Sequence, residues 1–260
     1  MRIAPAGLLL LTSTALAQNL PLQTEPATTA AGGTLVLETA GQAVGEVPNP
    51  LTGDPRTVLD MPLLRLVYSP AKEVELDLEW IGQVIAVNDP AFGDVSDWGD
   101  VTLRAKWCFA AEKPDRPALA VRFAVSLPET DFTYGLGPNT LRMRAEALLS
   151  KQLGRTTVHL NLGFATEDHP LGGPSQSDFV AYGAALEQPV APGVVLVGEV
   201  AGLGAGDGRP GTERRGEARF GLRCGRGRVV ADAALIRGVE VASGRWGVIA
   251  GLSWRIKPRG

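Results

Sequence analysis

Apolar and polar residues alternate one by one through most of the chain after residue 33. The segment PALAVRFAVSLPE shows the pattern most clearly, with one parity holding Leu119, Val121, Phe123, Val125 and Leu127. The other parity holds Ala118, Ala120, Arg122, Ala124 and Ser126. A helix, with its period of 3.6, would scatter both sets around its circumference, whereas successive residues of a strand point to opposite faces. The segment is therefore predicted to be a β-strand.

The same alternation predicts twelve strands along the chain. They lie at 33–41, 58–68, 73–86, 100–110, 118–127, 140–151, 156–165, 178–187, 194–202, 214–223, 228–236 and 245–256. Long and short connections alternate between these segments, which is typical of outer-membrane barrels, where short periplasmic turns alternate with longer outer loops. We therefore expect an all-β fold, a single closed antiparallel transmembrane β-barrel of about 12 strands.

The polar parity of several strands carries charges whose partners lie on neighbouring strands. An acidic row stands between a strand with Arg65 and one with Arg104 and Lys106, and its members are Glu73, Glu75, Asp77 and Glu79. A second row stands between strands with Glu199 and Asp232, and its members are Arg215, Glu217, Arg219 and Arg223. Opposed charges offset much of the cost of enclosing them in a narrow lumen. This pairing favours a barrel over the alternative, a soluble sandwich with a solvated polar face.

The first residues have the order of an export signal. Arg2 precedes the apolar run Gly7–Leu11, and small residues occupy positions 15 and 17. We expect a signal peptide at 1–17 cleaved after Ala17, a disordered, polar lead-in at 18–32, and the barrel at 33–260. No run of 18 apolar residues follows, as expected if strands and not helices cross the membrane. The net charge of −3 and the lack of a basic cluster argue against nucleic-acid binding.

Few residues offer catalytic or metal chemistry. The two histidines, His159 and His169, fall on a polar strand parity and in a long loop, so neither is predicted to be catalytic. The acidic loop 87–100 lacks the order of calcium ligands in an EF-hand. We expect no cofactor and no metal. Cys108 and Cys224 lie on strands half a circumference apart, and a disulfide requires Cα atoms within about 7 Å, so two free thiols are predicted.

Several segments resemble the MetA-pathway-of-phenol-degradation family of outer-membrane transporters. They are WGDVTLRAKW (98–107), AVRFAVSLPETD (120–131), LLSKQLGRTTVHLNLGF (148–164) and AYGAALEQPVAPGVVLVGEV (181–200). The similarity covers about 33–256. The chain departs from the family at Ile256, where an aromatic residue usually ends the last strand, and at Glu129, where a glycine usually follows the proline. The resemblance implies passage of small molecules, aromatic or hydrophobic ones among them.

We therefore expect a non-enzymatic, porin-like channel in the outer membrane of a two-membrane bacterium. Its predicted partners are outer-membrane lipid and lipopolysaccharide, a small-molecule solute and, during assembly, the barrel-insertion machinery. The predicted lumen-lining residues that select the solute are Glu75, Asp77, Glu79, Arg104, Arg122, Arg142, Arg144, Glu199, Arg215, Glu217 and Arg219. Two alternatives stay open: a plugged structural barrel without transport, and a lipid-modifying enzyme.

Overall fold

The computed structural model describes residues 20–172, 176–206 and 208–256, and these form one antiparallel sheet of fourteen strands. The first seven are β1 (Thr34–Pro48), β2 (Pro55–Ala71), β3 (Val74–Ile81), β4 (Val84–Asp89), β5 (Gly93–Asp97), β6 (Val101–Ala110) and β7 (Ala118–Leu127). The others are β8 (Arg142–Leu153), β9 (Thr156–Asp168), β10 (Gln176–Ala191), β11 (Val194–Ala205), β12 (Arg215–Arg226), β13 (Val229–Gly238) and β14 (Trp246–Ile256). A short 3-10 turn, η1 (Val241–Ser243), precedes β14. In these three ranges, no helix has the length and apolar character needed to cross a bilayer.

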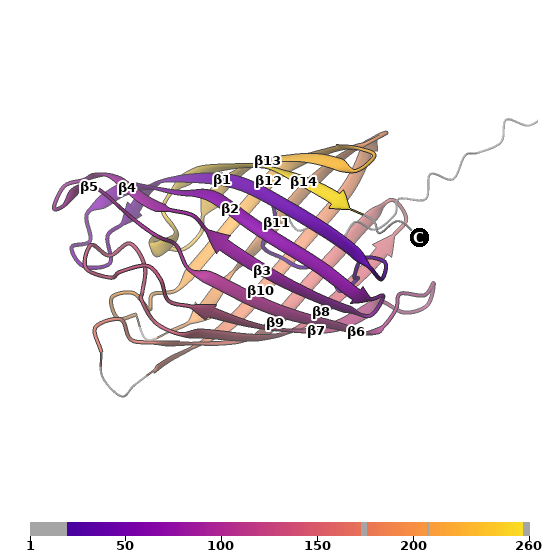
Figure 1. The fold of residues 1–260 in the computed structure, drawn as a ribbon, viewed down its shortest axis with the longest axis horizontal. Coiled ribbons are helices and arrows are strands. Elements are labelled where there is room, and N and C mark those ends of the chain that lie inside the picture. The colour runs from indigo at the N-terminus through magenta and orange to yellow at the C-terminus, as the bar shows by residue number, and fades with distance from the viewer. Residues whose placement is uncertain (1–19, 173–175, 207, 257–260) are drawn as a thin grey trace, which may run out of the picture.

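The sheet closes on itself through β1, which pairs with both β14 and β2. Within the described ranges, twelve strands make the closed wall, in the order β1-β2-β3-β6-β7-β8-β9-β10-β11-β12-β13-β14. The other two, β4 and β5, form a hairpin that continues from β2 at one end of the barrel (Figure 1). The predicted all-β, twelve-stranded closed barrel is confirmed.

Most strand limits differ from the expectation by a few residues, and two larger differences have local reasons. The first strand continues to Pro48, because register shifts within the β1–β2 pair let the hairpin run on instead of ending near residue 41. The predicted strand 73–86 is divided into β3 and β4 around Gly82 and Gln83. Pro62 of β2 lies opposite this break and has no N–H to donate to the ladder.

The two faces of the wall are inverted relative to those of a soluble protein. On β9, the outward side chains of Leu162 and Phe164 are 63% and 74% exposed. The inward side chains of His159 and Asn161 are 4% exposed each. The other strands repeat this order, with charged and small residues inside. Water would make such an apolar outer surface costly, whereas lipid makes it favourable. The alternation in the sequence therefore gives a lipid-facing outside and a polar inside.

Residues 20–32, here called the N-terminal segment, differ from the expected disordered lead-in. They lie inside the barrel, with Leu22, Thr24 and Ala27 almost fully buried. Thr24 rests on Gly183 of β10, where an added Cβ would lie only 2.7 Å from the threonine Oγ1. The composition of this segment is polar and rich in proline, but the lumen supplies partners that a lone peptide lacks. The expected signal peptide, 1–17, lies outside the described residues.

Short connections gather at one end of the barrel and longer ones at the other. The turn end holds the two-residue connections 72–73, 154–155, 192–193 and 227–228, the longer connection 111–117 and the end of β14. The loop end holds 49–54, 128–141 and 239–245, together with the β4–β5 hairpin (Figure 1). Long and short connections alternate as expected, although the loop after β1 is short because β1 and β2 are longer than predicted.

Candidate solute pathway

The inner wall on β2, β3 and β6 is a lattice of ion pairs. Asp77 binds Arg65 at 2.8 Å on one side and Arg104 at 2.9 Å on the other. Arg104 also binds Glu79 at 2.7 Å. Next along the strands, the Lys106 ammonium lies 2.6 Å from Glu75. The acidic row of β3 is thus placed between the basic residues of its neighbours, as the alternation predicts, and Glu73 at its end pairs with Lys72 in the exposed turn.

The wall on β7 and β8 carries a second group of arginines. Glu146 accepts hydrogen bonds from Arg122 at 3.0 Å and from Arg144 at 2.6 Å. Arg142 binds Asp100, which precedes β6. Gly163 of β9 lies beside Glu146, and a Cβ there would come within 2.8 Å of its side chain. The small residues on the inner parity therefore make room for charged neighbours.

The opposite wall, on β11, β12 and β13, is also paired. Arg223 binds Asp232 at 3.1 Å and Glu187 at 2.8 Å. Arg219 binds Glu217 at 2.9 Å and lies 3.8 Å from Glu199. These contacts satisfy charges that would otherwise be enclosed without partners, at a cost of several kcal/mol each.

The N-terminal segment crosses the lumen between these walls. It passes β12, where Arg223 and Arg219 donate to the backbone carbonyls of Leu20 and Pro21. The Glu199 carboxylate then accepts the backbone N–H groups of residues 23 and 24, at 2.7 and 2.8 Å. Farther along, the segment returns past β8, where the N–H of Ala27 donates to Ser150.

Glu25 is the main anchor of the N-terminal segment on the other wall. Its buried carboxylate lies 2.7 Å from Arg65, 3.0 Å from Arg122 and 3.6 Å from Lys106. These three cations belong to β2, β7 and β6, so one acidic side chain connects three strands. Charge-assisted bonds to a fully enclosed carboxylate are the strong class of hydrogen bond. The sequence pattern missed Glu25 because the segment that carries it has no strand periodicity.

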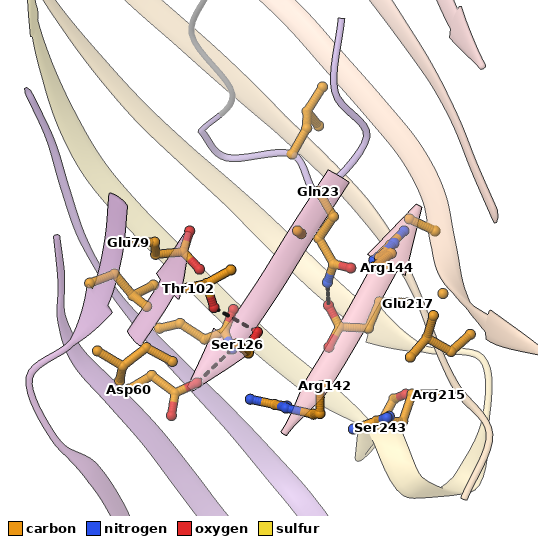
Figure 2. A pocket seen from close by; sticks show the side chains of 18 of the residues that line it. Gln23, Asp60, Glu79, Thr102, Ser126, Arg142, Arg144, Arg215, Glu217 and Ser243 are labelled. Atoms are coloured by element: carbon orange, nitrogen blue, oxygen red, sulfur yellow. Dashed lines mark hydrogen bonds between the residues drawn. The ribbon is translucent and has the colours of Figure 1, made fainter. Parts of the chain in front are cut away.

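A cavity of about 510 Å³ lies between the N-terminal segment and the loop end. Figure 2 shows Gln23 of the segment reaching toward Glu217, with Arg142, Arg144 and Arg215 beside them. Eight of the eleven predicted residues line this cavity: Glu79, Arg104, Arg122, Arg142, Arg144, Arg215, Glu217 and Arg219. The other three, Glu75, Asp77 and Glu199, lie in the ion-pair lattice against the N-terminal segment and do not line it.

Other residues of the cavity were not among those predicted. Glu167 binds Arg215 at 2.5 Å, because β9 continues past residue 165 and keeps its inner parity. Asp60 accepts a hydrogen bond from Gln42 at 3.0 Å, and no ion pair to it is formed within the described part of the chain. An apolar set also faces the cavity: Val44, Val47, Val58, Leu63, Ile81 and Ile249. The alternation gave no signal for this set, because inner and outer residues are both apolar there.

A serine, a histidine and a carboxylate meet near the turn end. His159 Nδ1 lies 2.7 Å from Ser150 Oγ, and its Nε2 lies 3.7 Å from Glu187. Ser150 and His159 are 1% and 4% exposed, and the Ser150 hydroxyl oxygen also accepts the N–H of Ala27. Ser150 and His159 are thus enclosed under the N-terminal segment. The alternation predicts the inner parity of His159 but gives no sign of either of its partners.

A further ion pair connects the loops at the loop end. Arg56 binds Asp89 at 3.1 Å and donates to the backbone carbonyl of Tyr134 at 2.8 Å. Asn49 also donates to Asp89 and to the carbonyl of Tyr134, so loops 49–54 and 128–141 and the β4–β5 hairpin are joined around this ion pair. The acidic residues of loop 87–100 therefore bind protein groups, and no cluster that could hold a metal ion is found in the described ranges.

Comparison with known proteins supports the fold. The chain is similar to the COG4313 outer membrane channel of Pseudomonas putida F1, with a TM-score of 0.64 and 20% identity over 88% of this chain and 98% of that one. It is also similar to the translocator domain of the autotransporter NalP from Neisseria meningitidis, with a TM-score of 0.54 and 14% identity over 87% and 90% of the two chains. No family model matches the sequence, and no curated protein matches it. The likeness establishes a barrel of the outer-membrane kind.

Proposed function

We propose that this protein is an outer-membrane channel through which small solutes pass. The observation that carries the proposal is the cavity of about 510 Å³, lined by charged side chains, inside a closed barrel whose outer face is apolar. Fixed charges that line a lumen can select among solutes, whereas a barrel built only for structure needs no cavity. The likeness to the Pseudomonas putida channel supports the same reading of the fold.

The selectivity would come from the charged residues that line the cavity. Arginines on β8 face acidic residues on β2 and β12, so a solute crossing the cavity meets opposed charges. Glu75, Asp77 and Glu199 would act indirectly, by holding Lys106, Arg65 and the N-terminal segment in place. The chain resembles the MetA-pathway family in segments 98–107, 120–131, 148–164 and 181–200, and its solute would be small.

In this proposal the turn end faces the periplasm and the loop end faces outward. The mature protein starts near Gln18 after cleavage of the signal peptide at Ala17, and the barrel contacts lipid and lipopolysaccharide. Assembly would require the barrel-insertion machinery, which recognises the end of the last strand. In this chain that strand end carries Ile256. The enclosed Ser150–His159 pair argues against an enzyme.

The second candidate is a plugged structural barrel, which the anchoring of Glu25 by three cations favours. Influx of an uncharged sugar into liposomes separates the two candidates. A channel should admit arabinose measurably faster in protein-containing liposomes than in empty ones. Equal rates in both, for a protein shown to be inserted by its heat-modifiable migration on gels, would favour the structural barrel.

A further inference from the structure

Three arginines that line the cavity retain unused hydrogen-bond donors. Arg142 binds Asp100, Arg144 binds Glu146 and Arg215 binds Glu167, each through Nη2. A guanidinium group has five N–H donors, so most of the capacity of each is unspent. The Nε of all three is buried and has no hydrogen-bond partner among the described residues. A buried donor without a partner is uncommon and requires an explanation.

The three arginines are neighbours in the fold. Arg142 and Arg144 are two residues apart on β8 and point to the same side of the strand. Arg142 stands opposite Glu167 in the β8–β9 pair, and Glu167 binds Arg215. Figure 2 shows the three side chains at the cavity together. We call them the arginine group.

Other arginines of the lumen differ from this group. Arg219 uses all three of its nitrogens, on Glu217, the carbonyl of Pro21 and Gln42. Arg65 also has an unpaired Nε, but its two terminal nitrogens face three carboxylates and its side chain is only 8% exposed. The side chains of the arginine group are 24–33% exposed, so they remain accessible from the cavity.

The opposite side of the cavity carries an apolar surface beside Gln42 and Asp60. Val44 and Ile249 belong to a buried cluster against which Leu63 packs, and all three line the cavity. They lie on β1, β14 and β2, across the barrel from β8 and β9. This surface would not stabilise a bound inorganic ion, because ions gain no favourable free energy from apolar contact. A pocket that joins a few polar groups to an apolar wall is typical of organic ligands, and about 510 Å³ is a usual size.

We propose that the cavity binds a small organic carboxylate with a compact apolar body. The arginine group would bind the carboxylate, since guanidinium matches its geometry with paired hydrogen bonds. The apolar body would lie against Val44, Leu63 and Ile249. Asp60 stands within this apolar side without an ion-pair partner in the described ranges, so its charge would disfavour a second carboxylate there. This inference rests on the proposed channel function and names its solute class.

Calorimetry on the purified mature protein in detergent tests the proposal with benzoate as the probe. Benzoate should bind at least tenfold more tightly than acetate, which lacks the apolar body, and than benzylammonium, which has the opposite charge. Terephthalate, with its second carboxylate, should also bind more weakly. The variants Arg142→Gln and Arg144→Gln should each weaken benzoate at least tenfold, because each loses a charge-assisted donor.

Two further variants make the test independent of folding defects. Leu63→Asn should weaken benzoate and leave acetate unchanged. Arg237→Gln, at an exposed residue stacked on Trp246 outside the cavity, should change neither. Heat-modifiable migration confirms that each variant forms a barrel.

Equal binding of benzoate and benzylammonium, or wild-type affinity in both arginine variants, would overturn the inference. Arabinose influx into liposomes distinguishes a failure of this inference from a failure of the proposed channel function. Influx without selective benzoate binding removes only the solute class, whereas no influx and no binding remove the proposed function as well.

Discussion

Replacing Glu25 with Ala should release the N-terminal segment from the wall and raise solute influx. The carboxylate is enclosed and contacts Arg65, Arg122 and Lys106 at 2.7, 3.0 and 3.6 Å. Removing one partner from a buried ion pair costs about 3–5 kcal/mol when the remaining charge is left uncompensated. Because Arg65, Arg122 and Lys106 keep Asp77, Glu146 and Glu75 as partners, the lower end of this range applies here. At 1.4 kcal/mol for each factor of ten, a cost of about 3 kcal/mol raises the undocked population roughly 10²-fold.

The assay is arabinose influx into liposomes, together with protease cleavage within residues 20–32. Both rates should rise in Glu25→Ala. Glu25→Gln should have a smaller effect, because its amide keeps the shape and some hydrogen bonds. Glu46→Ala is the matched control, since Glu46 is exposed and, within the described ranges, pairs with exposed Arg245, a contact worth about 0–1 kcal/mol. Wild-type influx and wild-type protease resistance in Glu25→Ala would refute the assigned role of this anchor.

Three other predictions follow from burial and exposure. Leu162→Arg places a charge on the lipid face and, near the bilayer midplane, should lower the free energy of unfolding by about 2–4 kcal/mol in a urea titration. Leu171→Arg, in an exposed loop, should leave this free energy unchanged. Similar losses in both variants would mean that the outer face is wrongly assigned. Both cysteines are free, so mass spectrometry without reductant should find no bridge between Cys108 and Cys224; a bridged peptide would contradict the strand order. Arg56→Ala should leave the buried carboxylate at the loop end uncompensated and increase protease cleavage in loop 128–141 without affecting heat-modifiable migration; an unchanged cleavage rate would show that the pair does not hold the loops.

The barrel itself could be predicted from the sequence, because strand geometry converts alternation directly into two faces. Val121 and Phe123 lie outside and Arg122 inside, as their parity requires. Pairing across neighbouring strands could be predicted for the same reason, and Asp77 binds both Arg65 and Arg104. The free cysteines are confirmed, since their distance follows from strand count alone.

The contents of the lumen could not be predicted in the same way. The partners of Glu25 come from three strands far from it in the sequence, and a proline-rich segment carries no periodic signal of its own. The contact between Ser150 and Glu187 through His159 likewise depends on tertiary packing across neighbouring strands. Parity tells which residues point inward, but not which of them face a cavity and which face a chain that occupies the lumen.

Single-channel recording in a planar bilayer tests the central claim most directly. The mature wild-type protein should give discrete current steps in symmetrical salt, and Glu25→Ala should raise the fraction of time spent in the open level. The exposed-pair variant Glu46→Ala should record like the wild type. A bilayer that contains inserted protein but stays at baseline current, for the wild type and for Glu25→Ala alike, would contradict a solute pathway through this barrel.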